Sequence, residues 1–287
     1  MGADRFAELL ADDKDRYSLA EACLLIAKDA CQGLDVNRYL AEIERMAARL
    51  RGRLPPGAGA EEKVIALNQF LFEDLGFSGN AEDYYDARNS YLNEVIERRR
   101  GIPISLSILY IEVGRKIGLP LEGISFPGHF LVRLGLRGST LVLDPFSGGA
   151  PLSEDDLRKL LRRVIAESGR ASLRSAGDVA AELPLDQFLE PAGHRQILAR
   201  MLRNLKNIHR EKDELQPLLQ VINRMLVVLP DANGELRDRG LVYQRLEAFR
   251  AALKDLGDYL ERDPDAMDAD EIRVRVVELT LLCARLN

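Results

Sequence analysis

The stretch "GIPISLSILYIEVGRKIGLPLEGISFPGHFLVR", residues 101–133, contains the change from helix to strand that decides the fold. Its first half predicts a helix from about Pro103 to Ile117, because proline suits the first helical position and Gly118 suits the stop. The apolar residues of this helix lie on two opposed sides: Ile104, Ile108 and Ile111 on one, and Leu106, Leu109, Val113 and Ile117 on the other. A helix with two apolar sides is expected to be buried between layers.

Three strands are predicted to follow the helix, at residues 121–126, 129–134 and 140–144, with Pro-Gly and Arg-Gly turns between them. Side chains alternate between the two faces of a strand. In the second strand the apolar Phe130, Val132 and Leu134 share one face, and His129 lies on the other. We therefore expect one core face and one face that carries His129.

The hairpin formed by the second and third strands has two possible registers. A Gly135–Gly138 pair places Asp144 directly opposite His129, and a Leu136–Ser139 pair places it one diagonal away. Directly opposite side chains have Cβ atoms roughly 4.5–5.5 Å apart, and diagonal neighbours remain within reach. Either register therefore permits a contact between His129 and Asp144.

The chain before this region is predicted to be helical. Apolar residues recur at spacings of three and four through residues 3–53, and Ser18 is a plausible N-cap with Glu21 as its capping-box partner. A further helix is expected over residues 61–75, after a Pro-Gly break. Residues 76–90, rich in Gly, Asn, Asp and Ser, are expected to form a loop.

The last third of the chain is helical in pattern and repeats. Pro230 and Pro264 lie 34 residues apart, which is the period of the tetratricopeptide repeat, a helix–turn–helix unit. Gly240 and Tyr243 also fit the pattern of that repeat. Two copies and a final capping helix, about Asp270 to Leu286, are therefore predicted, with a generic antiparallel helix hairpin as the alternative.

The composition, 46% hydrophobic and 30% charged residues, is that of an ordinary globular protein. A net charge of -6 argues against a nucleic-acid binder, which usually carries a basic surplus. The main basic cluster is Arg98–Arg100. Its place at the end of a helical pattern favours a solvated helix end over a phosphate clamp.

Other features favour a cytoplasmic protein without cofactor or metal. The chain becomes charged directly after its start, and its longest apolar stretch is too short to span a bilayer, so no membrane association is expected. Three scattered cysteines, Cys23, Cys31 and Cys283, predict thiols in a reducing compartment. The three histidines are far apart and no Gly-rich nucleotide-binding loop occurs, which disfavours metal and cofactor sites.

The segment "RNSYLNEVIERRRGIPISLSILYIEVGRKIGLPLEGISFPGHFLVR", followed by "LVLDPFSGG", resembles the bacterial transglutaminase-like proteins of the SirB type. The resemblance implies an α+β fold: a helix-rich, papain-like core with a small antiparallel sheet, followed by all-α tetratricopeptide repeats. On this basis we expect a transglutaminase-like domain at residues 1–165, a linking segment at 166–194 and a repeat domain at 195–287.

The resemblance also implies a Cys–His–Asp arrangement, in which His129 and Asp144 match the last two positions. The cysteine would open the central helix, where the helix N-terminus favours a thiolate. That position is Pro103, which carries no nucleophile. Of the nearby hydroxyls, Ser105 is expected on the polar side of the helix and Ser107 on a small-residue side.

Two functions follow as hypotheses. The first, favoured by Pro103, is a cytoplasmic interaction or regulatory protein: a pseudoenzyme core joined to a repeat region that binds a protein or peptide. The second is a serine-dependent hydrolase or acyltransferase that acts on an amide or ester through Ser105, His129 and Asp144. A serine nucleophile would also need an oxyanion hole, and the sequence shows no motif for one.

Overall fold

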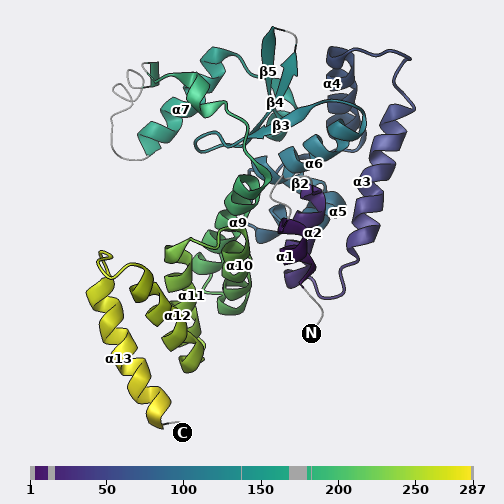
Figure 1. Cartoon of the computed structure of the whole chain (residues 1–287). Coiled ribbons are helices and arrows are strands. Elements are labelled where there is room, and N and C mark those ends of the chain that lie inside the picture. Colours follow the sequence, from purple (N-terminus) through teal and green to yellow (C-terminus); the bar gives the residue numbers. More distant parts are fainter. Residues whose placement is uncertain (1–3, 12–16, 137, 168–179, 182, 286–287) are drawn as a thin grey trace. The chain divides into compact units, whose positions relative to one another are not determined.

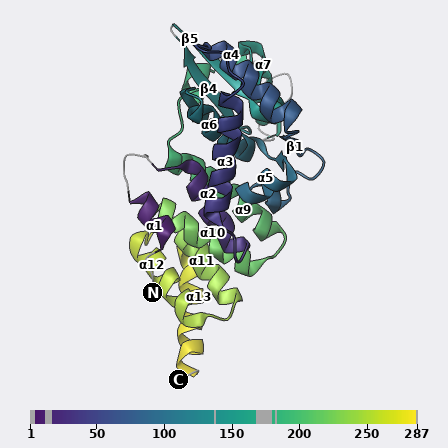
Figure 2. The ribbon, with the colours of Figure 1, turned by 90° about the vertical axis from the view of Figure 1, so that its right-hand side faces the viewer.

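The computed structural model describes residues 4–11, 17–136, 138–167, 180–181 and 183–285 (Figures 1 and 2). The chain divides into two compact units. The larger unit is Asp12–Ile197, and the smaller unit combines Met1–Ala11 with Leu198–Asn287. The larger unit contains the strands and the smaller unit is helical, so the predicted α+β class is confirmed.

The larger unit begins with helices, as the sequence predicts. They are α2 (Leu19–Ala30), α3 (Val36–Arg51), α4 (Ala60–Asn68) and α5 (Leu92–Arg98). The Ser18 hydroxyl accepts the backbone N–H of Glu21 at 3.2 Å, which confirms the predicted N-cap of α2. The predicted helix over 61–75 is α4 followed by a π-helical turn, Gln69–Asp74, which the sequence did not indicate.

Helix α6 (Pro103–Lys116) is the central element of the larger unit, and α3 packs along it (Figure 2). Every residue from Pro103 to Gly114 is buried, which confirms the predicted position between layers. The buried carboxylate of Glu112 accepts the backbone N–H groups of Leu19 at 3.1 Å and Ala20 at 3.3 Å. Helix α6 therefore supplies part of the N-terminal cap of α2.

The main sheet is antiparallel, with the order β3 (Leu121–Ile124), β4 (Leu131–Leu136), β5 (Ser139–Asp144) and β6 (Ala150–Pro151). Leu136 pairs with Ser139, so the diagonal register is confirmed and the Gly135–Gly138 alternative is wrong. The second strand begins at Leu131 rather than at His129. Strand β6 was not predicted, nor was the parallel pair of β1 (Ser78–Gly79) and β2 (Arg100–Gly101).

Both faces of β4 are buried, so the prediction of a single core face is wrong. Leu131 and Val132 point to opposite faces, and each is 0% exposed. Leu131 packs in a cluster with Leu157 and Leu161 of α7 (Glu154–Glu167), while α6 packs against β3 and β4 (Figure 1). The second layer arises because α7 returns to the sheet after β6.

The smaller unit consists of helix pairs and a final helix. Its helices after the boundary at Ile197 are α9 (His194–Glu211, which begins before the boundary), α10 (Leu215–Val228), α11 (Asn233–Arg245), α12 (Phe249–Arg262) and α13 (Ala269–Arg285). Pro230 follows α10 and Pro264 follows α12, so the two prolines occupy equivalent places. A Cβ on Gly240 would lie 2.7 Å from a carbon of Leu256, which explains glycine where α11 meets α12.

Ion pairs connect the successive helix pairs. The Nζ of Lys206 lies 2.6 Å from carboxylate oxygens of both Glu235 and Asp238. Arg237 contacts Asp238 and Asp268, each at 2.7 Å. Helix α9 is thereby connected to α11, and α11 to the turn that precedes α13.

The short helix α1 (Arg5–Leu10) belongs to this unit, whereas the sequence placed it with the core. The Arg224 guanidinium contacts Asp4 at 2.5 Å and lies 4.8 Å from the ring centroid of Phe6. These contacts to Arg224 of α10 explain why α1 belongs to the smaller unit. Residues 168–179 and 182 of the expected linking segment, 166–194, and Arg137 of the hairpin turn lie outside the described residues.

Candidate functional site

His129 is held at the end of the turn that precedes β4. Gly128 has a φ of 65°, and a Cβ there would lie 2.3 Å from a methyl group of Val164 in α7. Glycine is therefore required both by the backbone conformation and by the close approach of α7. The backbone N–H of His129 donates to the carbonyl of Phe126 at 3.1 Å, which holds the backbone of His129 in the turn.

Asp144 ends β5 and caps the short 3-10 turn Pro145–Ser147. Its carboxylate accepts the backbone N–H of Phe146 at 3.0 Å and the hydroxyl of Ser147 at 2.8 Å. The Nε2 atom of His129 lies 3.0 Å from the same carboxylate. Because an ionised carboxylate only accepts, this bond assigns a proton to Nε2 and leaves Nδ1 with the free lone pair.

Asp144 stays ionised although it is buried. Burial by itself would raise the pKa of Asp144, but the bonds from His129, Ser147 and the Phe146 N–H lower it below its ordinary value. A charged carboxylate beside Nε2 orients the imidazole.

His129 and Asp144 line a cleft of about 600 Å³, which we call the His129 cleft. Pro103, the first residue of α6, lines the same cleft. One wall comes from α7 and is charged, with Asp156, Lys159, Arg163 and Glu167. The structure therefore brings the imidazole, the carboxylate and the start of the central helix together around one cavity.

Ser105 is not among the residues that line the His129 cleft. It is 1% exposed, and its hydroxyl donates to the carbonyl of Asn89 at 2.6 Å. The same oxygen accepts the backbone N–H of Ile102 at 3.1 Å, so Ser105 caps the start of α6. Ser107 is also buried, with its hydroxyl 3.5 Å from the carbonyl of Phe130.

Several residues around the imidazole were not predicted from the sequence. The ring of Phe146 meets that of His129 edge to face, with centroids 6.0 Å apart, and Ser147 shares the carboxylate of Asp144. An Asp followed by Pro is a recognisable helix-start signal, and it could have revealed the cap at Asp144. No local sequence signal predicts that charged residues of α7 line the cleft, because tertiary packing decides which face of that helix lies against it.

The described residues offer neither a thiol nor a metal cluster at the cleft. None of the three cysteines lines it. Burial, and then the charge of Glu112, raises the pKa of the Cys23 thiol. Within the described ranges, no three His, Cys, Asp or Glu side chains are grouped so that they could hold a metal ion. No helix among those residues is long and apolar enough to cross a membrane.

Two known protein families match this chain, and they are the two that its sequence motifs indicate. The family described as the transglutaminase-like superfamily matches residues 37–203, and the tetratricopeptide repeat matches residues 205–276. The predicted order of a transglutaminase-like region and a tetratricopeptide region is therefore confirmed.

Three relatives illustrate how far the similarity extends. A UPF0162 protein of Xylella fastidiosa (strain Temecula1 / ATCC 700964) is 41% identical over 93% of this chain and 92% of its own length. Protein SirB1 of Salmonella typhimurium is 25% identical over 82% of each chain. F-box only protein 21 of Mus musculus is 43% identical over 33% of this chain, but over only 17% of its own length.

Proposed function

Because the chain belongs to the transglutaminase-like superfamily and carries tetratricopeptide repeats, we propose that it is a regulatory protein that binds other proteins. In this proposal the core recognises its target without reacting with it. The observation that carries the proposal is Pro103, which lines the His129 cleft at the place where the resemblance calls for a cysteine.

Proline removes two features that acyl transfer needs at this place. Its side chain has no heteroatom to attack a carbonyl, and its backbone has no N–H to stabilise an oxyanion. The proton of Ser105 is directed to the carbonyl of Asn89, away from any role as a nucleophile. What remains is a polar cleft whose imidazole and charged wall can form hydrogen bonds with a bound protein segment.

The repeat unit supplies the second part of the proposal. Arg203, Asn207 and Arg210 are exposed along one side of α9. Stacked helix pairs commonly present such faces to a protein segment, and arginines favour an acidic one. The three free thiols agree with a cytoplasmic location, which is also part of the proposal.

A Pro103→Cys substitution tests the first part. The helix N-terminus and His129 should lower the pKa of a thiol at this place. The variant should then react with iodoacetamide at pH 7 roughly tenfold faster than the wild-type cysteines. Adding His129→Ala should remove most of this gain, and Pro103→Ala serves as the control without a thiol. No gain in Pro103→Cys would contradict a core that lacks only its nucleophile.

A hydroxyl-reactive phosphonate probe tests the alternative of a serine enzyme. We expect no labelling of the wild-type chain beyond that of a denatured sample. Labelling of the native wild type that disappears in Ser105→Ala would overturn the proposal and support a serine-dependent hydrolase or acyltransferase.

Charge reversal tests the repeat surface in the full-length chain. Arg203→Glu with Arg210→Glu should reduce capture of an acidic peptide library at least tenfold. Lys254→Glu, an exposed charge reversal on α12, is the matched control and should bind as the wild type does. Equal binding by all three proteins would contradict a role for this face of α9.

A further inference from the structure

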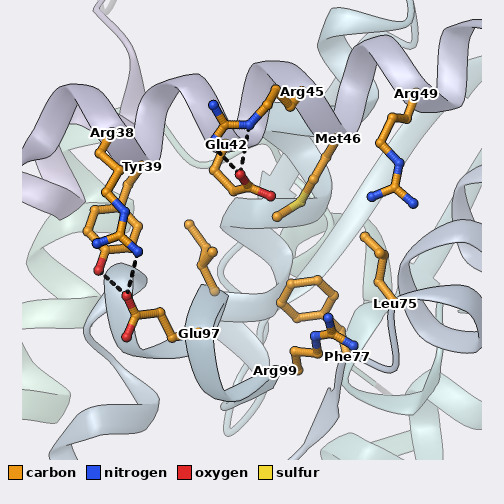
Figure 3. A pocket seen from close by; sticks show the side chains of 11 residues that line it. Arg38, Tyr39, Glu42, Arg45, Met46, Arg49, Leu75, Phe77, Glu97 and Arg99 are labelled. Carbon is orange, nitrogen blue, oxygen red and sulfur yellow. Dashed lines mark hydrogen bonds and ion pairs between the residues drawn. The ribbon is translucent and has the colours of Figure 1, made fainter.

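A second hollow in the larger unit lies between α3, α5 and the segment that follows the π-helical turn (Figure 3). It has a volume of about 280 Å³, and we call it the arginine pocket. Met46, Phe77 and Ile96 give it a buried apolar floor. Four arginines and two glutamates also line it: Arg38, Arg45, Arg49, Arg99, Glu42 and Glu97.

The two glutamates neutralise only two of the four arginines. Arg38 lies 3.6 Å from Glu97, and the Nε atom of Arg45 donates to Glu42 at 2.9 Å. Across the described parts of the chain, no carboxylate pairs with Arg49 or Arg99. The pocket therefore has a surplus of two positive charges, in a chain whose net charge is -6.

The two unpaired guanidinium groups face the same space. Figure 3 shows Arg49 reaching from α3, and Arg99 from the end of α5, toward the hollow beside Leu75 and Phe77. The Arg49 guanidinium also lies 5.4 Å from the ring centroid of Phe70, a contact that orients it without neutralising its charge.

The backbone of Arg99 adds an independent observation. Arg99 has a φ of 57° and a ψ of 27°, the left-handed conformation that usually selects glycine at the end of a helix. The chain needs this conformation to turn from α5 into β2, where the Arg99 carbonyl accepts the N–H of Ser78 at 3.0 Å. An arginine is a costly choice for this position, which suggests that its side chain has a role.

We propose that the arginine pocket binds a phosphate monoester carried on a small apolar group. A phosphomonoester at pH 7 carries about -1.5 to -2 charges, which matches the surplus of two, whereas a carboxylate carries only one. Guanidinium groups bind phosphate oxygens through paired hydrogen bonds. The floor of Met46, Phe77 and Ile96 would receive the apolar part.

The three arginines of the cluster Arg98–Arg100 have different surroundings. Arg98 lies 3.4 Å from Asp86, and Arg100 is exposed and does not line the pocket. Only Arg99 faces the pocket, so a neighbouring residue of the same type provides a matched control.

Titration calorimetry with phenyl phosphate on the full-length protein tests the proposal. We expect saturable binding that weakens as salt is added. Inorganic phosphate, which lacks the apolar part, and benzoate, which has a single charge, should each bind at least tenfold more weakly. Absence of phenyl phosphate binding, or equal binding of all three probes, would overturn the proposal.

Substitutions of single arginines test whether phenyl phosphate binds in the arginine pocket. Arg99→Gly should weaken phenyl phosphate binding at least tenfold and should fold, because glycine accepts the left-handed conformation. Arg49→Gln should weaken binding to the same extent from the opposite wall. Arg100→Gln, with the same change in charge, should stay within twofold of the wild type. Equal losses in Arg99→Gly and Arg100→Gln, or none in Arg49→Gln, would refute the site.

Discussion

The His129 cleft and the arginine pocket lie in the same unit of the chain. They differ in the burial and the pairing of their charged side chains. In the cleft, the Asp144 carboxylate is buried and receives hydrogen bonds from His129, Phe146 and Ser147. In the pocket, Arg49 and Arg99 are exposed and lack carboxylate partners among the described residues.

The difference distinguishes two roles of a polar side chain, one in the stability of the fold and one in ligand binding. A buried group with satisfied hydrogen bonds stabilises the fold even when no reaction takes place. The His129–Asp144 pair can therefore persist beside Pro103 without catalysis. Exposed like charges that converge on one hollow contribute little to stability, and a bound anion would give them a role.

Asp144→Ala is expected to have the largest effect on stability. The substitution removes the acceptor of three hydrogen bonds in a buried place, so the free energy of unfolding should fall by about 3 kcal/mol. Urea unfolding measures this loss. Ser147→Ala leaves the carboxylate in place and should cost only about 1 kcal/mol. A loss below about 1 kcal/mol in Asp144→Ala would show that the cleft is not structural.

The stability contributed by the same pair should depend on pH. The folded-state pKa of Asp144 is lowered, so its carboxylate contributes stability above the unfolded pKa of about 4. That contribution is lost as the pH falls through the folded pKa. The difference in stability between wild type and Asp144→Asn should therefore be largest above about pH 5 and shrink below pH 4. Urea midpoints across this range measure it, and a constant difference would contradict the assignment.

Ser105→Ala should show that Ser105 belongs to the frame of α6 rather than to the cleft. The substitution removes the cap on the Ile102 N–H and the bond to the Asn89 carbonyl, so we expect a loss of about 1–2 kcal/mol. Thermal unfolding measures the change. Ser107→Ala is the comparison within the same helix and should cost less, since its one contact is long. Equal stability of Ser105→Ala and wild type would contradict the capping role.

The smallest effect is expected in the arginine pocket. Arg99→Gly relieves a left-handed conformation that costs an L-residue about 1–2 kcal/mol, although glycine also loses more chain entropy on folding. The net gain should be about 0.5 kcal/mol, read from the urea midpoint. Arg100→Gln should leave stability unchanged within about 0.5 kcal/mol. A loss above about 1 kcal/mol in Arg99→Gly would mean that the side chain supports the fold.

Much of the fold could be predicted from local sequence signals. The bounds of α6 follow from Pro103 and Gly118, and the cap of α2 follows from Ser18, because these residues act within one helical turn. The repeat follows from the spacing of Pro230 and Pro264. Each of these signals lies within one element or one repeat, so the sequence is sufficient to predict these helix bounds, the cap and the repeat.

The candidate site was only partly predictable. The residues His129 and Asp144 could be named, and either hairpin register allowed them to meet. The sequence could not choose between the registers, because the turn residues suit both. It also could not show that the backbone carbonyl of Asn89, which lies before α5, accepts a hydrogen bond from the Ser105 hydroxyl.

Local sequence signals are sufficient for helices α2, α3, α4 and α6, for strands β3, β4 and β5, for the repeat period and for the missing nucleophile at Pro103, but not for the short strands β1, β2 and β6. The tertiary structure decided which side chains share a cavity. Residues from α3 and α5 meet in the arginine pocket, and α7 covers the second face of the sheet. Element identity depends on neighbours along the chain, whereas charge pairing and burial depend on residues that only packing brings together.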